Sequence, residues 1–369
     1  MLENQLNNLE QIPFAEGYSS PHYHNVIAGP CSAETEKQVR DTAIALCNIG
    51  IKVFRAGLWK PRSSPSTFEG VGAKGLKWLI RAKEETGMLI ATEVATSEHV
   101  KLALDAGVDV LWIGARTTTN PFVTQEIADA LNGEKDTIVL VKNPVTPDIE
   151  LWIGALQRIN NAGIKKLGAI HRGFSAYGNH LYRNMPQWRI AIELKRRFPT
   201  LPIFSDPSHM GGKRELVPTL SQQALDMGFD GLFIESHCNP CTALSDAQQQ
   251  LSPSELETML KSLIIRRTTR STDNIDNLRQ EIDRCDDELV EVLNKRMAIS
   301  REIGIYKKEH DIKVVQTNRF DEILRKRVNQ ASQLGMSAKF MEAIMSVIHE
   351  ESVRQQVDIL SRSKDIDQQ

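Results

Sequence analysis

The chain has 369 residues, a formal net charge of −2 and a hydrophobic content of 41%. This length allows one large and one small domain, and the near-neutral charge argues against a protein that binds nucleic acid or a membrane surface. The N-terminus lacks a basic stretch followed by an apolar one, and no run of about 18 apolar residues occurs, so we expect neither a signal peptide nor a membrane-spanning helix. Five scattered cysteines fit a reducing cytoplasm better than a disulfide framework.

After a lead of residues 1–24, one pattern repeats as far as residue 264: a short apolar run, then a longer amphipathic segment. The apolar runs predict strands at Val26–Gly29, Val53–Gly57, Leu89–Val94, Val110–Gly114, Thr137–Lys142, Leu167–Gly173, Ile203–Asp206 and Leu232–Glu235. The segments between them predict helices at Glu36–Ile49, Lys74–Thr86, Ser97–Ala106, Thr124–Leu131, Pro147–Ala162, Met185–Arg197 and Val217–Met227. Alternation of this kind over about 240 residues predicts an α/β fold, a (β/α)8 TIM barrel, with an open doubly wound sheet as the alternative.

Polar residues follow the predicted strands, so we expect the functional side chains at one end of the barrel. His209 lies in the turn after the seventh strand, and Glu235 ends the eighth. The carboxyl ends of barrel strands meet at one mouth, where active sites form. The candidate metal ligands there are Cys31, His209, Glu235 and Asp246. A thiolate, an imidazole and two carboxylates suit a divalent ion such as Mn²⁺ or Fe²⁺, with Co²⁺ as a further option.

Cations lie in or directly after the same strands: Arg55, Lys60, Arg62, Arg116, Lys142 and Arg172. Solvated loop residues are the ordinary explanation for such charges. Burying several cations without partners is costly, however, so their number at strand ends points to bound anions. Guanidinium and ammonium groups gathered at one mouth fit phosphates and carboxylates. The sequence therefore predicts a site for more than one anionic group beside the metal.

Motifs in the barrel region resemble the short β type of the type I DAHP synthases: Gly29-Pro-Cys-Ser-Ala-Glu34, Lys60-Pro-Arg62, Gly114-Ala-Arg116, Asp206-Pro-Ser-His209, Glu235-Ser-His237 and Ala243-Leu-Ser-Asp246. That family condenses phosphoenolpyruvate with erythrose 4-phosphate and releases phosphate. The resemblance implies the metal ligands named above. It also implies a phosphoenolpyruvate site of Arg55, Lys60, Arg116, Lys142 and Arg172, and an erythrose 4-phosphate site of Lys60, Arg62 and Ser63. Lys60 is expected to be catalytic, as a proton donor to the new alkoxide.

Two alternatives to this interpretation stay open. The sister KDO8P synthases share the barrel and the donor, but carry Asn in the loop where this chain has Lys60-Pro-Arg62. The Lys-Pro-Arg form therefore favours erythrose 4-phosphate over arabinose 5-phosphate as the acceptor. Cys238 and Cys241 form a C-x-x-C pair, for which a zinc or redox role is conceivable, although a second pair and a thioredoxin context are missing.

Residues 265–273 are polar and predict a linker, and residues 274–369 predict a separate all-α domain. Seam positions recur at intervals of three and four: Ile275, Leu278, Ile282, Cys285, Leu289, Val292, Arg296, Ile299, Ile303 and Tyr306. This spacing predicts one helix of about 30 residues and 45 Å, followed by helices near Asn318–Gln330 and Ser337–Leu360. Such a helix is too long for a small domain to cover, so we expect a homodimer through this domain.

Residues 274–358 resemble the all-α chorismate mutases, through single residues at matching intervals: Arg279, Arg296, Lys307, Arg319, Ser352 and Gln356. Those enzymes rearrange chorismate to prephenate. The resemblance implies that these six residues bind the substrate, with Arg279 supplied by the partner chain and with Arg296, Lys307 and Gln356 catalytic. Gln316 and Phe320 depart from the Asp and Glu typical of the family. The structural alternative is that Arg296 and Lys307 only extend their charged ends from a coiled coil.

The sequence thus predicts a bifunctional, metal-dependent enzyme of aromatic amino-acid biosynthesis. Its substrates would be phosphoenolpyruvate, erythrose 4-phosphate and chorismate. We also expect the mutase domain to sense prephenate or chorismate and to slow the synthase. The rivals are a synthase with a catalytically inactive helical regulatory or dimerisation domain, and a KDO8P synthase-like transferase.

Overall fold

The computed structural model describes residues 6–12, 25–61, 67–178, 181–266, 273–315 and 317–361. The chain divides into two compact units, residues 1–267 and residues 268–369. Three positions singled out in the sequence, Arg62, Ser63 and Gln316, lie outside the described residues. Within the described ranges, no helix combines the length and the apolar character needed to cross a membrane.

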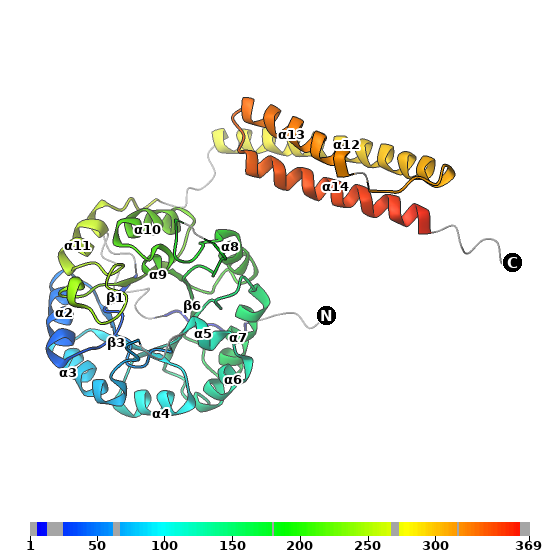
Figure 1. The fold of residues 1–369 in the computed structure, drawn as a ribbon. Helices are drawn as coiled ribbons and strands as arrows, with labels where there is room; N and C mark the ends of the chain where they lie inside the picture. The colour runs from blue at the N-terminus through cyan, green and yellow to red at the C-terminus, as the bar shows by residue number, and fades with distance from the viewer. Residues whose placement is uncertain are drawn as a thin grey trace. The chain divides into compact units, whose positions relative to one another are not determined.

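The first unit is a closed barrel of eight parallel strands in sequence order, which confirms the predicted fold class and excludes the open sheet (Figure 1). Its strands are β1 Val26–Gly29, β2 Val53–Arg55, β3 Leu89–Val94, β4 Val110–Ile113, β5 Ile138–Lys142, β6 Leu167–His171, β7 Ile203–Ser205 and β8 Gly231–Glu235. The barrel closes where β1 pairs with β8, and there Gly29 lies opposite Glu235. This closure brings the ends of the first and last strands together at the mouth.

Helices form a ring around the strands (Figure 1). They are α2 Glu36–Asn48, α3 Leu76–Thr86, α4 Ser97–Ala106, α5 Ala115–Thr118, α6 Pro121–Ala130, α7 Ile149–Asn161, α8 Trp188–Arg197, α9 Pro207–Gly211, α10 Val217–Asp226 and α11 Pro253–Ser262, with short 3-10 turns η1 Gly72–Gly75, η2 Arg214–Leu216 and η3 Pro240–Thr242. Gly87 and Gly107 end α3 and α4 in the left-handed conformation, at φ of 70° and 87°. Helix α6 begins earlier than predicted, because Asn120 caps it and Pro121 occupies its first turn.

Strand side chains alternate between the helices and the barrel interior. The interior cluster contains Trp112, Leu140, Phe204 and Phe233, all fully buried. Ile12 joins this cluster at 1% exposure, so the N-terminal lead contributes to the barrel core. The domain boundary predicted at residue 25 does not anticipate this contact.

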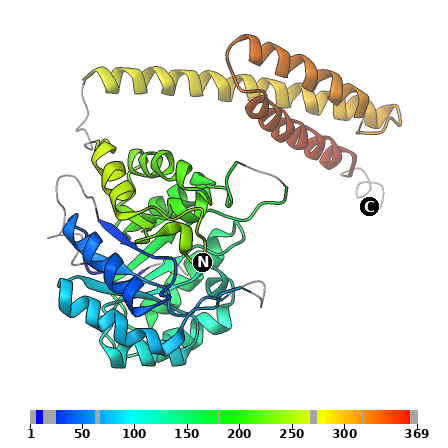
Figure 2. The same ribbon diagram turned by 60° about the vertical axis from the view of Figure 1, so that its left-hand side comes forward.

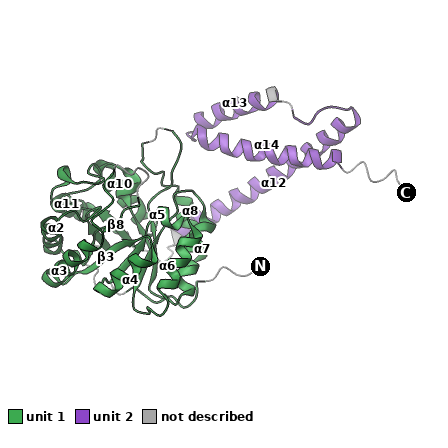
Figure 3. Cartoon of the chain, turned by 60° about the horizontal axis from the view of Figure 1, so that its bottom comes forward, with its two compact units in different colours: residues 1–267 green, residues 268–369 purple. Residues whose placement is uncertain are grey.

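In its described residues the second unit contains three helices, α12 Asp273–Glu309, α13 Thr317–Gln333 and α14 Ala338–Ser361, as the apolar spacing predicted (Figure 2). Helix α12 has 37 residues, which at 1.5 Å each span about 55 Å. Its N-terminal part extends beyond α13 and α14 (Figure 2), and Leu278, Ile282 and Leu289 there are 54%, 60% and 55% exposed. The two units are coloured separately in Figure 3.

Candidate active site

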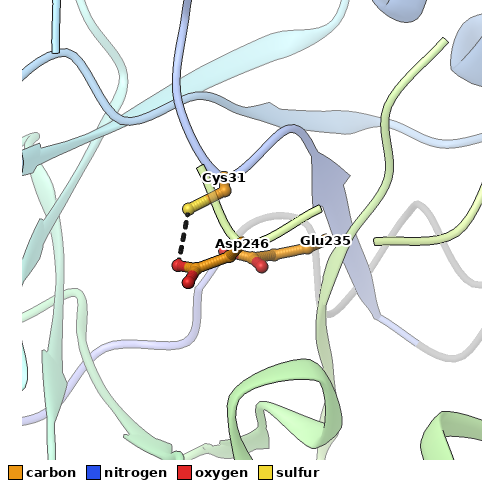
Figure 4. A group of neighbouring side chains, drawn as sticks. All are labelled: Cys31, Glu235 and Asp246. Atoms are coloured by element: carbon orange, nitrogen blue, oxygen red, sulfur yellow. Dashed lines mark hydrogen bonds between the residues drawn. The ribbon is translucent and has the colours of Figure 1, made fainter. Parts of the chain in front are cut away.

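Three of the four predicted metal ligands meet at the mouth of the barrel (Figure 4). Cys31 follows β1, Glu235 ends β8 and Asp246 lies in the loop after η3. One ligand atom of each lies within 4.8 Å of the other two. The Cys31 thiol donates to Asp246 Oδ2 at 3.1 Å. Residues that are about 200 positions apart in the chain therefore form one compact group of sulfur and oxygen donors.

The fourth predicted ligand, His209 on α9, borders this group but is not part of it. Its Nε2 lies 3.6 Å from Glu235 Oε1, and its Nδ1 lies 2.8 Å from Asp206 Oδ2. Asp206 also caps α9 by accepting from the His209 backbone N–H at 3.0 Å, and Lys142 donates to Asp206 Oδ2 at 2.8 Å. Asp206 therefore orients both a predicted ligand and a predicted substrate-binding lysine, a role that sequence reasoning did not assign.

This donor set fits a divalent cation. Cys31 and Glu235 are fully buried. Burial raises the pKa of the Cys31 thiol, and the charge of Glu235 raises it further. Burial alone would raise the pKa of Glu235 as well, but His209 and Arg55 keep it below its usual value. Two carboxylates beside a thiol, with an imidazole at their edge, are ligands that a borderline transition metal accepts.

Arg55 ends β2 and is fully buried. Its Nη2 lies 3.2 Å from Glu235 Oε1, and its guanidinium carbon lies 4.3 Å from the ring centroid of Phe233 and 4.9 Å from that of Trp112. Its Nε and Nη1 are buried and have no hydrogen-bond partner among the described residues. Buried donors of this kind are normally satisfied, so an anionic ligand is their natural partner.

Four more of the predicted cations line a small cavity of about 50 Å³ beside the metal ligands: Lys60, Arg116, Lys142 and Arg172. The Arg172 guanidinium donates to Asn184 Oδ1 at 2.9 Å. Burial lowers the pKa of Arg172 to about 10, which leaves it charged at neutral pH. Burial also lowers the pKa of Lys142, although Asp206 opposes this effect. The structure therefore brings all five predicted phosphoenolpyruvate residues to the same region.

Lys60 lies 3.7 Å from Glu93 Oε2, and the Trp112 indole N–H donates to the same oxygen at 3.2 Å. Burial acts to lower the pKa of Lys60, but the charges of Cys31 and Glu93 outweigh it and raise that pKa. Gly114 leaves the space that Glu93 fills, because a Cβ there would lie 2.1 Å from Glu93 Oε1. Lys60 is therefore held protonated at the cavity wall.

Sequence reasoning missed Arg183 and the buried Gln249, which contact the metal ligands through hydrogen bonds. Both lie in polar loops, where no apolar period marks a residue as buried or functional. The C-x-x-C pair is different. Cys238 and Cys241 are exposed, and no group of three metal-ligating side chains found in the described ranges includes either one.

A second group of predicted residues meets between α12 and α14. Arg296 Nη1 donates to Ser352 Oγ at 2.5 Å, and Lys307 Nζ donates to Gln356 Oε1 at 3.2 Å. Gln356 Nε2 donates in turn to Ser300 Oγ at 3.1 Å. Burial lowers the pKa of both Arg296 and Lys307. The structure therefore brings four of the six predicted mutase residues together between these two helices.

The remaining two mutase residues lie elsewhere in the described chain. Arg319 pairs with Glu322 at 2.7 Å on the surface of α13. Arg279 pairs with Asp276 at 3.2 Å on the exposed part of α12. The substituted position Phe320 stacks on His349, with ring centroids 4.0 Å apart.

Comparison with known proteins finds one family model that matches the barrel region and another that matches the helical region. The model of the DAHP synthetase I family matches residues 19–271, and the model of chorismate mutase type II matches residues 278–357. A phospho-2-dehydro-3-deoxyheptonate aldolase of Thermotoga maritima is 34% identical over 229 residues, which are 62% of this chain and 65% of the relative. The matched part therefore spans just under two thirds of that relative.

One further relative and one solved structure are also similar to this chain. A 2-dehydro-3-deoxyphosphooctonate aldolase of Polaromonas naphthalenivorans is 29% identical over 289 residues, 72% of this chain and 97% of the relative. The crystal structure of a Thermotoga maritima DAHP synthase aligns with a TM-score of 0.58 and 32% identity, covering 65% of this chain and 68% of that one.

Proposed function

Because the chain belongs to the DAHP synthetase I family and carries a chorismate mutase type II region after its barrel, we propose that it is a bifunctional shikimate-pathway enzyme. The barrel condenses phosphoenolpyruvate with erythrose 4-phosphate to give DAHP and phosphate. The helical unit rearranges chorismate to prephenate. The observation that carries the first activity is the group of Cys31, Glu235 and Asp246 next to buried cations at one mouth.

The barrel cations bind phosphoenolpyruvate through its phosphate and carboxylate. Arg55 supplies two buried donors, and Lys142 and Arg172 add charge from β5 and from the end of β6. Arg62 and Ser63 bind the phosphate of erythrose 4-phosphate. Carbon 3 of phosphoenolpyruvate attacks the aldehyde carbon, Lys60 protonates the resulting alkoxide, and water adds at carbon 2 before phosphate leaves.

Cys31, His209, Glu235 and Asp246 would hold the divalent ion, for which we propose Mn²⁺ ahead of Fe²⁺ or Co²⁺. When bound, such an ion supplies a Lewis acid for the aldehyde oxygen. The proximity of His209 Nε2 to Glu235 Oε1 supports its inclusion in the ligand set.

For the mutase, Arg296, Arg319 and the partner chain's copy of Arg279 bind the two carboxylates of chorismate. Lys307 and Gln356 stabilise the negative charge that develops on the ether oxygen as the bond breaks, and Ser352 holds Arg296 in place. The unpartnered apolar stretch of α12 supports a homodimer through this unit, which would bring Arg279 to the second site. We further propose that prephenate bound there inhibits the synthase.

One assay tests the synthase: consumption of phosphoenolpyruvate with erythrose 4-phosphate or arabinose 5-phosphate as acceptor. The expected result is turnover with erythrose 4-phosphate and little with the pentose. The second candidate function is that of the KDO8P synthases, with arabinose 5-phosphate as the acceptor. It is favoured by the Polaromonas naphthalenivorans relative, because the match covers 97% of that protein. Preference for arabinose 5-phosphate would establish that function instead.

Two further assays test the helical unit. Prephenate formation from chorismate distinguishes a mutase from an inactive helical domain. The inactive alternative is favoured by Phe320, which stands where the family typically has Glu. Synthase rates with increasing prephenate test the regulatory proposal. A synthase rate that saturating prephenate leaves unchanged would remove the feedback role.

A further inference from the structure

Three consecutive glutamines follow Asp246 closely, in the loop between η3 and α11, and they differ sharply in burial. Gln248 is exposed, whereas Gln249 and Gln250 are 1% and 0% exposed. A buried amide is tolerated where hydrogen bonds satisfy both its ends. The partners of the two buried amides therefore indicate what they hold.

Gln249 connects the two carboxylates of the metal group. Its Nε2 donates to Glu235 Oε2 at 2.6 Å, and its Oε1 accepts from Arg183 Nη1 at 2.8 Å. The same guanidinium nitrogen donates to Asp246 Oδ1 at 2.9 Å. A continuous chain of hydrogen bonds thus runs from Glu235 through Gln249 and Arg183 to Asp246.

This chain occupies one oxygen of each carboxylate and leaves the other directed at the remaining predicted ligands. Glu235 Oε1 lies 3.6 Å from His209 Nε2, and Asp246 Oδ2 lies 3.1 Å from Cys31 Sγ. If either carboxylate rotated, the wrong oxygen would face the group. The geometry therefore separates an outer oxygen on each acid, held by Gln249 or Arg183, from an inner oxygen that faces the other predicted ligands. Arg55 Nη2 also lies 3.2 Å from the inner oxygen of Glu235.

Gln250 makes a similar connection to the third member. Its Oε1 accepts from the backbone N–H of Cys31 at 3.0 Å, and its Nε2 donates to the carbonyl of Ser245 at 2.8 Å. This ties the residue after β1 to the residue directly before Asp246. The two glutamines together contact all three residues of the group or their immediate neighbours.

We propose that Gln249 is a positioning residue: with Arg183 it fixes Glu235 and Asp246 so that one oxygen of each is presented to a divalent ion. The proposal rests on the metal site of the proposed function. Partners that orient metal ligands typically change metal affinity by 10- to 100-fold when removed. Gln249 does not touch the ion in this account, so its effect acts through the two carboxylates.

The test measures Mn²⁺ affinity directly, on full-length chelator-treated protein without substrates, by titration calorimetry. Gln249→Leu is expected to weaken Mn²⁺ binding by about 10- to 100-fold. Gln248→Leu is the matched control, since it makes the same change one residue earlier on the exposed side of the loop, and it should alter the affinity by less than about twofold. In Co²⁺-loaded protein, the d–d absorption should shift in Gln249→Leu and stay in place in Gln248→Leu.

Arg183→Gln is a second variant that tests the same hydrogen-bond chain. Because the Arg183 side chain is 45% exposed, this variant should fold even if Gln249→Leu does not. It also separates positioning from simple electrostatics. Removing a cation beside Asp246 should tighten Mn²⁺ binding if charge alone matters, whereas loss of positioning should weaken it. We expect weaker binding.

Equal Mn²⁺ affinity and an unchanged Co²⁺ spectrum in folded Gln249→Leu would overturn the proposal, as would tighter binding by Arg183→Gln. The wild-type titration distinguishes failure of the Gln249 proposal from failure of the metal site. Wild-type protein that binds no Mn²⁺, Fe²⁺ or Co²⁺ would refute the metal site itself, and this inference with it.

Discussion

Arg55 shows how a single side chain can indicate a ligand. It is fully buried against aromatic rings, and two of its nitrogens have no partner among the described residues. Burying a charged group without full hydrogen bonding is costly. A buried Arg55 is explained if a bound substrate accepts its remaining hydrogen bonds. Arg55 is therefore expected to contribute more to substrate binding than to the stability of the free protein.

The first prediction follows from this difference. Phosphoenolpyruvate at 100 times its dissociation constant should stabilise the wild-type protein by about 2.7 kcal/mol, measured by thermal unfolding. In Arg55→Met the gain at the same concentration should fall to less than half. Arg158→Met on α7 removes an arginine whose described hydrogen bond is to its own helix, at Gly154, and should keep the full gain. An undiminished gain in Arg55→Met would contradict the assignment.

His171 on β6 is a buried histidine outside the proposed chemistry. It packs among Trp152, Phe174, Trp188 and Phe229. Neither ring nitrogen has a hydrogen bond of ordinary geometry among the described residues. The backbone of Pro186 lies near enough to act in the direction of a higher His171 pKa. Burial lowers the pKa of His171 from 6.5 to about 3. Between these values the unfolded chain binds a proton that the folded chain does not.

The second prediction concerns pH. Because the folded pKa of His171 is depressed, its contribution is fully present above pH 6.5 and is lost as the pH falls toward 3. Between pH 7 and pH 5, the loss attributable to His171 is about 2 kcal/mol in the free energy of unfolding. His171→Phe should remove that part of the pH dependence, as followed by urea unfolding of the barrel at both values. Identical pH dependence in the two proteins would rule out a neutral buried His171.

At the level of residues, the sequence predicted part of the metal group and its surroundings. Cys31 and Glu235 were recognisable because each comes at or just after the end of an apolar run. Asp246 lies in a loop without an apolar period, so only its place after the eighth strand indicated it. Gln249 and Arg183 gave no signal, because their role depends on three-dimensional proximity between loops that are more than 60 residues apart.

At the level of elements, the alternation of short apolar runs and amphipathic segments predicted the barrel well. Four of its eight predicted strand ends extended too far, as at Val53–Gly57, where the strand stops at Arg55. The apolar pattern continues there, while the chain turns toward the mouth and leaves the sheet. The packing of Ile12 inside the barrel was not predictable, since a single apolar residue in a polar lead carries no periodic signal.

Helix α12 leads to the third prediction. Its exposed apolar residues should be covered by a second copy, so Leu289→Glu should place a charge in that interface and convert a dimer into a monomer. Light scattering would then report one chain mass of 41.5 kDa in place of two. Phe122→Glu, at a still more exposed apolar residue on α6 of the barrel, should leave the dimer intact. A wild-type monomer, or a Leu289→Glu dimer, would count against this interface.

At the level of the whole molecule, the two proposed activities belong to different compact units. Lys60 and Lys307 are matched in this respect: each is a lysine proposed to act on an oxygen of its own substrate. The fourth prediction is that Lys60→Met lowers the synthase rate by at least about 100-fold with normal mutase, and that Lys307→Met does the reverse. Separate assays of phosphate release and prephenate formation measure both. A single variant that abolished both activities would show that the sites are not independent.

We propose that a thiol, an imidazole and two carboxylates at the barrel mouth support a metal-dependent condensation. The decisive experiment measures DAHP formation by wild-type protein after complete chelation, and again after Mn²⁺, Fe²⁺ or Co²⁺ is added back. Activity should disappear on chelation, return with at least one of these ions, and stay absent in Cys31→Ser combined with Asp246→Asn. Full activity in the metal-free protein would show that the condensation needs no ion.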